Sequence, residues 1–156
     1  MKVVTHMHSA ASLARRQRGL ATVEFALCAP VLFLLLFATA EVGRVLFQYN
    51  TLVKAVRDGA RYAVTAATNT SGVVSITPAM SSATRNLVVT GNIAGSGAPV
   101  LPELTVAAVD VTDDDDGFIR VSATYVYRPM LGTLPTFGFG DAIDLSMTLS
   151  AAVVMR

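Results

Sequence analysis

The 156-residue sequence has no tryptophan, a single cysteine and only two histidines, and 15% of its residues are charged. Both histidines, His6 and His8, lie in the first eight residues, so the rest of the chain has no imidazole for a catalytic triad or a metal site. Cys28 has no second cysteine with which to form an internal disulfide. No sequence feature proposes a catalytic carboxylate pair, so we expect no enzymatic activity and no cofactor.

The scarcity of charge is most pronounced between residues 20 and 40, where Glu24 is the one charged side chain in 21 residues. About 20 predominantly apolar residues suffice for a helix to cross a bilayer, whereas a soluble domain has about 25% charged residues overall. A buried core helix is the weaker interpretation, because residues 32–37 offer no polar side. The composition therefore predicts a transmembrane helix over residues 20–40.

Positive charge is concentrated at the N-terminus. Residues 1–18, which we expect to be unstructured, carry a net charge of +4, and residues 19–156 carry a net charge of −3. A short basic head directly before an apolar run is typical of a targeting or orientation signal. Because no basic stripe with interleaved aromatic residues follows, we expect no nucleic-acid partner.

A helical pattern continues beyond the apolar run. Apolar side chains recur at steps of three and four residues between residues 42 and 63, which predicts an amphipathic helix. With the apolar run it predicts one helix over residues 20–66, in which Pro30 removes a backbone hydrogen bond and bends the axis. The predicted buried side consists of Val42, Leu46, Tyr49, Val53, Val56, Ala60 and Ala63.

The remainder of the chain has the patterns of a short helix and three strands. Thr77 as N-cap and Pro78 at the first helical position predict where that helix begins. Apolar residues alternate with polar ones over residues 118–127 and 143–153, and more weakly over residues 103–111, which predicts strands. The sequence "TDDDDG" joins the strand predicted over residues 103–111 to the strand predicted over residues 118–127, which predicts a hairpin. The fold class is therefore α+β: a long N-terminal helix whose amphipathic half packs on a small antiparallel β-sheet.

Two ordinary interpretations of the N-terminus leave Glu24 unexplained. A secretory signal peptide would be cut after Ala40, at the sequence "ATA", and would release a β-rich binding domain. An uncleaved single-pass anchor would keep the same domain on a membrane. Both place an acid inside an apolar run, where an isolated charge is costly.

The stretch "RGLATVEF" resembles the prepilin-type leader, a basic segment that ends in glycine and is cut after that glycine. Here the glycine is Gly19, Leu20 becomes the N-terminal residue, Glu24 takes the fifth position of the mature chain, and Phe25 follows it. In pilins this glutamate is thought to compensate the N-terminal charge of a neighbouring subunit. The physical basis is sound, because the helix dipole favours an acid near a helix N-terminus, where it can also pair with an amine.

Residues 15–67 as a whole resemble the TadE-like minor pilins, or pseudopilins, of tight-adherence (Tad or Flp, type IVb) pili. In that family a proline interrupts the apolar run, as Pro30 does, and an acid-glycine-arginine set ends it, as Glu41, Gly43 and Arg44 do. An R-[DE]-G-A-R-Y-A motif follows in the family. It is matched here by Arg57, Asp58, Gly59, Ala60, Arg61, Tyr62 and Ala63.

The resemblance implies a structural subunit that is cut by a prepilin peptidase and takes part in pilus assembly and adhesion. Its implied partners are the peptidase, other pilins or pseudopilins, the inner-membrane assembly platform and the lipid bilayer. The implied parts are a leader (residues 1–19), an assembly helix (20–40), its amphipathic continuation (41–67) and a periplasmic α+β domain (68–156). The leader would be cytoplasmic, and the chain would be single-pass in the bacterial inner membrane or part of an extracellular pilus.

Two charged clusters each keep two interpretations. Arg57, Asp58 and Arg61 are either a solvated helix side or a surface that packs on another subunit or on the sheet. The second cluster consists of Asp113, Asp114, Asp115 and Asp116. Clustered carboxylates suit a calcium ion, but the spacing of these four does not match an EF-hand loop. A solvated turn is therefore the favoured interpretation.

Overall fold

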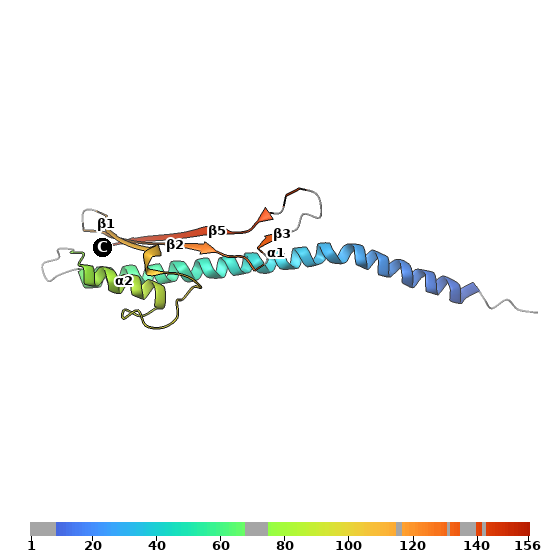
Figure 1. Ribbon diagram of the computed structural model, residues 1–156, viewed down its shortest axis with the longest axis horizontal. Helices are drawn as coiled ribbons and strands as arrows, with labels where there is room; N and C mark the ends of the chain where they lie inside the picture. The colour runs from blue at the N-terminus through green and yellow to red at the C-terminus, as the bar shows by residue number, and fades with distance from the viewer. Residues whose placement is uncertain (1–8, 68–74, 115–116, 131, 135–139, 142) are drawn as a thin grey trace, which may run out of the picture. The chain divides into compact units, whose positions relative to one another are not determined.

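A computed structural model describes residues 9–67, 75–114, 117–130, 132–134, 140–141 and 143–156 (Figure 1). The helices are α1 (Ser9–Ala67), α2 (Pro78–Thr90) and the short 3-10 helix η1 (Val106–Ala108). The strands are β1 (Val109–Asp113), β2 (Ile119–Tyr127), β3 (Thr133–Leu134), β4 (Ile143–Asp144) and β5 (Met147–Met155). The chain divides into two compact units, Met1–Ala40 and Glu41–Arg156, and each is described by itself.

The first unit contains the N-terminal part of helix α1, whose apolar side chains are exposed. Leu20, Phe25 and Leu27, for example, are 71%, 66% and 73% exposed. Within the described part of the chain, one helix is long and apolar enough to cross a membrane, Gly19–Ala67, with a mean hydropathy of 2.3 in its apolar window. An apolar helix without a protein cover fits the predicted membrane anchor.

Helix α1 begins at Ser9, so the expectation that residues 1–18 are unstructured is wrong for residues 9–18. The segment "SAASLARRQR" lacks proline and is rich in Ala, Leu, Arg and Gln, which have high helix propensities. Gly19 destabilises a helix by only about 1 kcal/mol relative to alanine, which is too little to end it. Residues 1–8 lie outside the described residues.

In the second unit, helix α1 buries one side. The buried positions recur every three or four residues, as the amphipathic pattern predicts. Two of the buried residues, near the start of the unit, are polar, and those further toward the end of the helix are small or aliphatic. The buried positions are Glu41, Gln48, Leu52, Val56, Gly59, Ala60, Ala63 and Ala67.

The predicted stripe is right in its second half and wrong in its first. Val42, Leu46 and Tyr49 are 59%, 56% and 41% exposed. Glu41 and Gln48 occupy the buried side at this level instead. The periodicity of apolar residues does not reveal buried polar residues. It therefore predicts that the neighbouring, apolar side of the helix is buried at this level.

Helix α2 begins where the sequence predicts it. The Thr77 hydroxyl accepts a hydrogen bond from the Met80 N–H at 3.2 Å, and Pro78 takes the first helical position. Gly91 ends the helix with a left-handed φ of 71°, and its N–H donates to the Leu87 carbonyl at 2.8 Å. The predicted short helix is therefore confirmed.

The main sheet has three antiparallel strands in the order β1–β2–β5, and β3 and β4 form a separate antiparallel pair. Strands β1 and β2 form the predicted hairpin, and the Asp114 N–H donates to the Phe118 carbonyl at 2.9 Å at its end. Strand β2 alternates as predicted, because every second residue from Ile119 to Tyr127 is buried.

Two predicted strands have different bounds in the structure. Glu103 has a φ of 61°, which does not fit a strand, so β1 begins only at Val109, after η1. The strand predicted over residues 143–153 is split into β4 and β5 at Leu145 and Ser146. The Asp144 carboxylate accepts hydrogen bonds from Ser146 N and Oγ, both at 2.8 Å, and this local turn competes with the sheet ladder.

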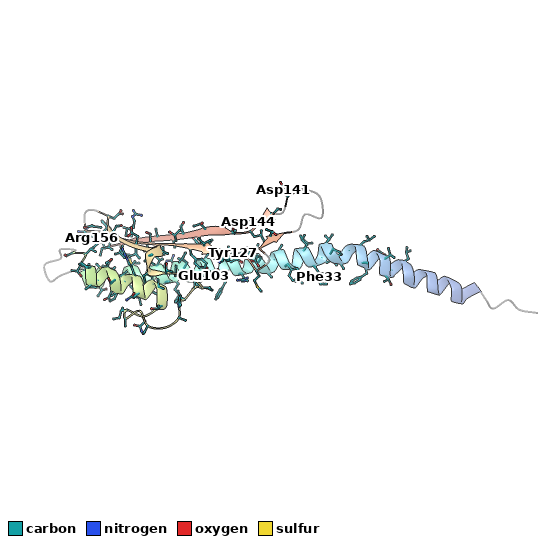
Figure 2. All side chains as sticks on the ribbon, in the orientation of Figure 1. Phe33, Glu103, Tyr127, Asp141, Asp144 and Arg156 are labelled. Carbon is teal, nitrogen blue, oxygen red and sulfur yellow. The ribbon has the colours of Figure 1, made fainter. Side chains whose placement is uncertain are left out.

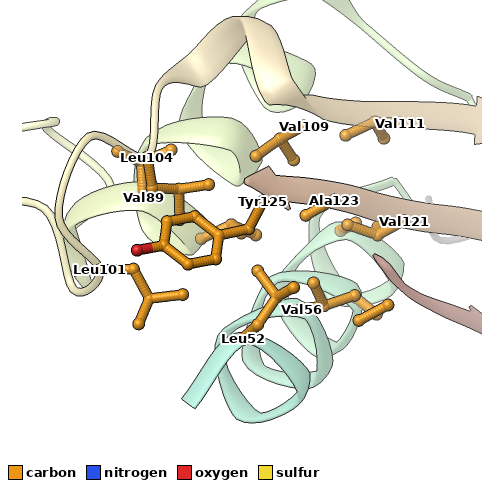
Figure 3. Close-up of a cluster of buried hydrophobic side chains, with 14 of the residues drawn as sticks. Leu52, Val56, Val89, Leu101, Leu104, Val109, Val111, Val121, Ala123 and Tyr125 are labelled. Atoms are coloured by element: carbon orange, nitrogen blue, oxygen red, sulfur yellow. The ribbon is translucent and has the colours of Figure 1, made fainter. Parts of the chain in front are cut away.

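The core of the second unit lies between α1, α2 and the inner side of the sheet. Figure 3 shows Leu52 and Val56 of α1 facing Val121 and Ala123 of β2, with Val89 of α2 beside them. These side chains belong to one continuous cluster of buried hydrophobic residues. The predicted packing of the amphipathic helix on a small antiparallel sheet is confirmed within residues 41–156.

Gly59 allows α1 and α2 to approach closely. A Cβ atom at this position would overlap Val88 Cγ2 and would lie 3.6 Å from Thr84 Cγ2. Val88 and Thr84 are fully buried and β-branched, so they have little freedom to move aside. The glycine of the motif over residues 57–63 therefore has a packing function.

Substitution of Gly59 by leucine should destabilise the protein, because the new side chain overpacks the contact between α1 and α2. We expect the Gly59→Leu substitution to lower the free energy of unfolding by about 1–3 kcal/mol, measured by circular dichroism in detergent. Gly43→Leu is the matched control, because Gly43 is helical and exposed and has no atom within 4 Å of a Cβ position. Equal losses in the two variants would contradict the packing function.

Candidate functional site on helix α1

The predicted cleavage site lies inside helix α1. Gly19 and Leu20 are both exposed, and none of the described atoms outside the helix backbone and chain neighbours comes within 4 Å of a Cβ position at Gly19. A peptidase therefore meets no obstructing side chain at this glycine within the described part of the chain. Cleavage itself stays a prediction.

Glu24 and Phe25 follow on the same exposed helix. The Glu24 side chain forms no hydrogen bond or ion pair with the described residues, and Phe25 is 66% exposed. Among the described residues this acid thus has no cationic partner. An α-amino group at Leu20 would lie one helical turn away, about 6 Å along the axis. The assembly function of Glu24 and Phe25 stays a prediction.

The apolar segment between these residues and the second unit contains Pro30 and Cys28. Pro30 lies inside α1 and has no N–H to donate, but the predicted bend stays a prediction. Cys28 is exposed on the helix, together with its apolar neighbours. The segment therefore has no described protein partner of its own, as expected of a surface that lipid or other subunits cover.

Glu41 lies at the centre of a buried group of polar contacts that the sequence did not predict. It is only 7% exposed, and its Oε1 accepts hydrogen bonds from the Tyr127 hydroxyl and from the Met130 N–H, the latter at 2.9 Å. Its Oε2 lies 3.9 Å from Arg44 Nη1. The Arg44 guanidinium also lies over the Tyr127 ring, 5.8 Å from its centroid. A buried carboxylate is tolerated when it is paired in this way.

These contacts join the helix to the end of strand β2. Tyr127 and Glu41 are 86 positions apart in the sequence. No local pattern could therefore have predicted this pair. The acid-glycine-arginine set marked Glu41 and Arg44 without indicating their partner. Burial, together with the hydrogen bond to Glu41, raises the pKa of Tyr127 to about 12.

The charged motif over residues 57–62 divides between two sides of α1. Gly59 and Ala60 are buried, and Tyr62 is half-buried. Arg57 and Arg61 are exposed, as is Asp58, and no hydrogen bond or ion pair joins these three side chains to the described residues. The inner half of the motif serves packing within the chain, and the outer half is available to a partner.

The acidic turn does not form a complete site among the described residues. Asp114 is held by Arg120, whose Nε and Nη2 donate to its two carboxylate oxygens at 3.0 and 2.7 Å. Asp113 is exposed, and Asp115 and Asp116 lie outside the described residues. No group of three or more His, Cys, Asp and Glu side chains that could hold a metal ion occurs in the part of the chain that the structure describes.

Removal of the Tyr127 hydroxyl should destabilise the attachment of β2 to α1. We expect Tyr127→Phe to lower the free energy of unfolding by about 1.5–3 kcal/mol, the usual contribution of a hydrogen bond to a charged group. Because the pKa of Tyr127 is raised in the folded state, its contribution is present below pH 10 and is lost as the pH rises toward about 12. The Tyr127→Phe variant should not show this loss of stability at alkaline pH. The measurement is the free energy of urea unfolding across the same pH range.

Tyr125→Phe is the control for the same measurement. Tyr125 lies two residues earlier on the same buried side of β2, and its hydroxyl donates no hydrogen bond to the described residues. Its substitution should leave the free energy of unfolding near neutral pH almost unchanged. Equal losses in the two variants at neutral pH would show that the bond to Glu41 is not a stabilising contact.

The chain resembles a known family along helix α1. The family model for TadE-like proteins matches residues 19–61. The match begins at the glycine of the predicted cleavage site and ends inside the charged motif, so the sheet lies outside it. A search of curated proteins and a search of solved structures found no match. Over residues 19–61 the chain is thus similar to TadE-like proteins, and this match supports a TadE-like protein of the tight-adherence (Tad) pilus system.

Proposed function

We propose that this protein is a minor pilin that is cut after Gly19 and then assembled, through the helix that begins at Leu20, into a tight-adherence pilus. The observation that carries the proposal is the exposed apolar segment over residues 20–40, which has near its start one acid without a partner among the described residues. The family match to TadE-like proteins, components of pili, supports it. The short leader ahead of Gly19 is basic, as a cytoplasmic segment would be.

The charge of Glu24 needs a compensating partner, which an assembly of subunits can provide. A carboxylate in the hydrocarbon region of a membrane is costly unless it is paired or lies close to the interface. Cleavage after Gly19 creates an amine at the head of the helix, where the dipole also favours an acid. In a filament, the amine of one subunit would meet Glu24 of the next, so that two charges would be compensated together.

The second unit fits a structural subunit. Two of its surface grooves have volumes of about 280 and 290 Å³, below the range of about 300–1,000 Å³ for small-molecule sites. Its buried polar cluster around Glu41 and Tyr127 is occupied by internal contacts. The partners that we propose are a prepilin peptidase, other pilins of the same pilus, the inner-membrane assembly platform and the lipid bilayer. Pilus assembly and adhesion follow from these partners.

The N-terminal residue of the mature protein tests the cleavage. In cells with the prepilin peptidase, mass spectrometry should find Leu20 as the first residue, and in cells without it Leu20 should not appear. The substitution Gly19→Val should block cleavage, because a side chain then occupies the cut position. Gly43→Val, on an equally open part of the helix, should leave cleavage intact. A mature protein that begins at Glu41 would support a secretory signal peptide and would exclude this proposal.

Glu24 is tested separately from cleavage. We expect Glu24→Ala and Glu24→Gln to be cut normally and to be lost from pili, because both remove the negative charge. Cys28→Ala is the control, since Cys28 is exposed on the same segment and carries no charge there. The measurement is the amount of the protein in the sheared pilus fraction relative to the membrane fraction. Incorporation of both Glu24 variants at the wild-type level would remove the function assigned to the acid.

A further inference from the structure

The outer side of α1 in the second unit is a basic surface without an internal partner. Lys54, Arg57 and Arg61 are all exposed and, at steps of three and four residues, lie on the side of the helix opposite Leu52 and Val56. Their side chains form no ion pair with the described residues, in contrast to Arg120 or Arg128 elsewhere in the unit. We call these three residues, Lys54, Arg57 and Arg61, the basic surface.

A groove runs beside the basic surface. It has a volume of about 280 Å³ and lies between α1 and the end of α2. Its walls are mainly apolar or small and include two charged residues, Lys54, which is shared with the basic surface, and the acid Asp58. A groove of this size suits one or two inserted side chains better than a small-molecule ligand. The lining residues are Thr51, Lys54, Ala55, Asp58, Leu87, Gly91 and Val100.

The β3–β4 pair carries the complementary features. Asp144 is exposed on β4, and Asp141 is exposed three residues before it in the chain (Figure 2). Ile143, the first residue of β4, is an apolar side chain that is 55% exposed. Ser146 N and Oγ donate hydrogen bonds to the Asp144 carboxylate and lower the pKa of Asp144. No lysine or arginine occurs between residues 132 and 155. Ile143 has no cover in the described chain, and the acids beside it have no cationic partner.

We propose that the basic surface and groove of one copy bind the β3–β4 pair of a second copy, with Ile143 inserted into the groove and Asp141 and Asp144 against Lys54, Arg57 and Arg61. The charges are opposite in sign, and each surface pairs an apolar element with charged ones. Such a contact removes the exposed isoleucine from water and compensates charges that have no partner among the described residues. The direction of the two copies rests on the proposed function, because both N-terminal helices then enter the same membrane or filament.

The two surfaces lie at different levels of the second unit. The segment before β3 is tied to the start of the unit by the hydrogen bond from Met130 N to Glu41, whereas the basic surface is centred near Arg57. Sixteen residues of helix separate these levels, about 24 Å at 1.5 Å per residue. Two parallel copies must therefore be displaced along the helix by about this distance. A contact between two different surfaces is heterologous and can continue from copy to copy, as a filament requires.

Cysteine cross-linking in native membranes tests the contact with the full-length chain. In a Cys28→Ser background, one tagged copy carries Ala55→Cys in the groove and a second, differently tagged copy carries Ile143→Cys. We expect a short bismaleimide to give a dimer only when both copies are present. The control replaces Ile143→Cys by Val126→Cys, an equally exposed apolar position at 59% on the outer side of β2. No dimer, or a dimer of equal yield with the control, would overturn the proposal.

Charge reversal separates the ionic contact from chance proximity. Arg57→Glu with Arg61→Glu on the groove copy should abolish the cross-link, and Asp141→Lys with Asp144→Lys on the hairpin copy should restore it. Recovery by the second pair also shows that the reversed copies are folded. Because the pairs are exposed, raising the salt concentration should weaken the wild-type cross-link. A cross-link that is indifferent to both reversals would contradict the contact.

The outcomes distinguish this proposal from the proposed function. If the mature chain begins at Leu20 and reaches the pilus fraction but no cross-link forms, the contact between copies is wrong and the pilin function stands. If Ile143→Cys instead cross-links to a different pilin, the choice of a second copy is wrong. If the cross-link forms in a chain that is not cut after Gly19, the contact stands and the proposed processing is wrong.

Discussion

Helix α1 contains an exposed apolar stretch and a stretch that packs on other elements of the chain. The other features of the structure follow from this division. Its residues 20–40 present exposed apolar side chains with no described protein cover. Its residues 41–67 bury one side, and small residues such as Gly59 and Ala63 let other elements approach closely. The sheet and α2 cover the second stretch only. The first has no cover among the described residues, which fits a membrane anchor in a pilus-system protein.

The two acids of the helix show how that constraint is met. Glu41 receives its partners within the chain, from Tyr127, Met130 N and Arg44, and so it can be buried at the start of the second unit. Glu24 receives none from the described residues. The amine that cleavage would create is the simplest compensation for it. Glu41 thus fixes the sheet to the helix, and the function that we propose for Glu24 is in assembly.

The sequence predicted what local patterns determine. The apolar run, the Thr77 cap of α2, the alternation in β2 and the α+β class were all predictable, because each depends on neighbouring residues. The buried side of α1 near Glu41 was mispredicted, because its polar residues acquire partners far away in sequence. The division between β4 and β5 depends on the Asp144 turn, which alternation alone does not reveal. For the site, composition and resemblance indicated the residues of α1, and the partner of Glu41 required the structure.

The central claim is that the mature protein begins at Leu20 and becomes part of a pilus through the exposed segment over residues 20–40. The most direct measurement is mass spectrometry of pili sheared from cells and purified away from membranes. The account predicts that the chain is present in this fraction with Leu20 as its first residue. Absence of the chain from pili, with a released form that begins at Glu41 in the medium, would contradict it.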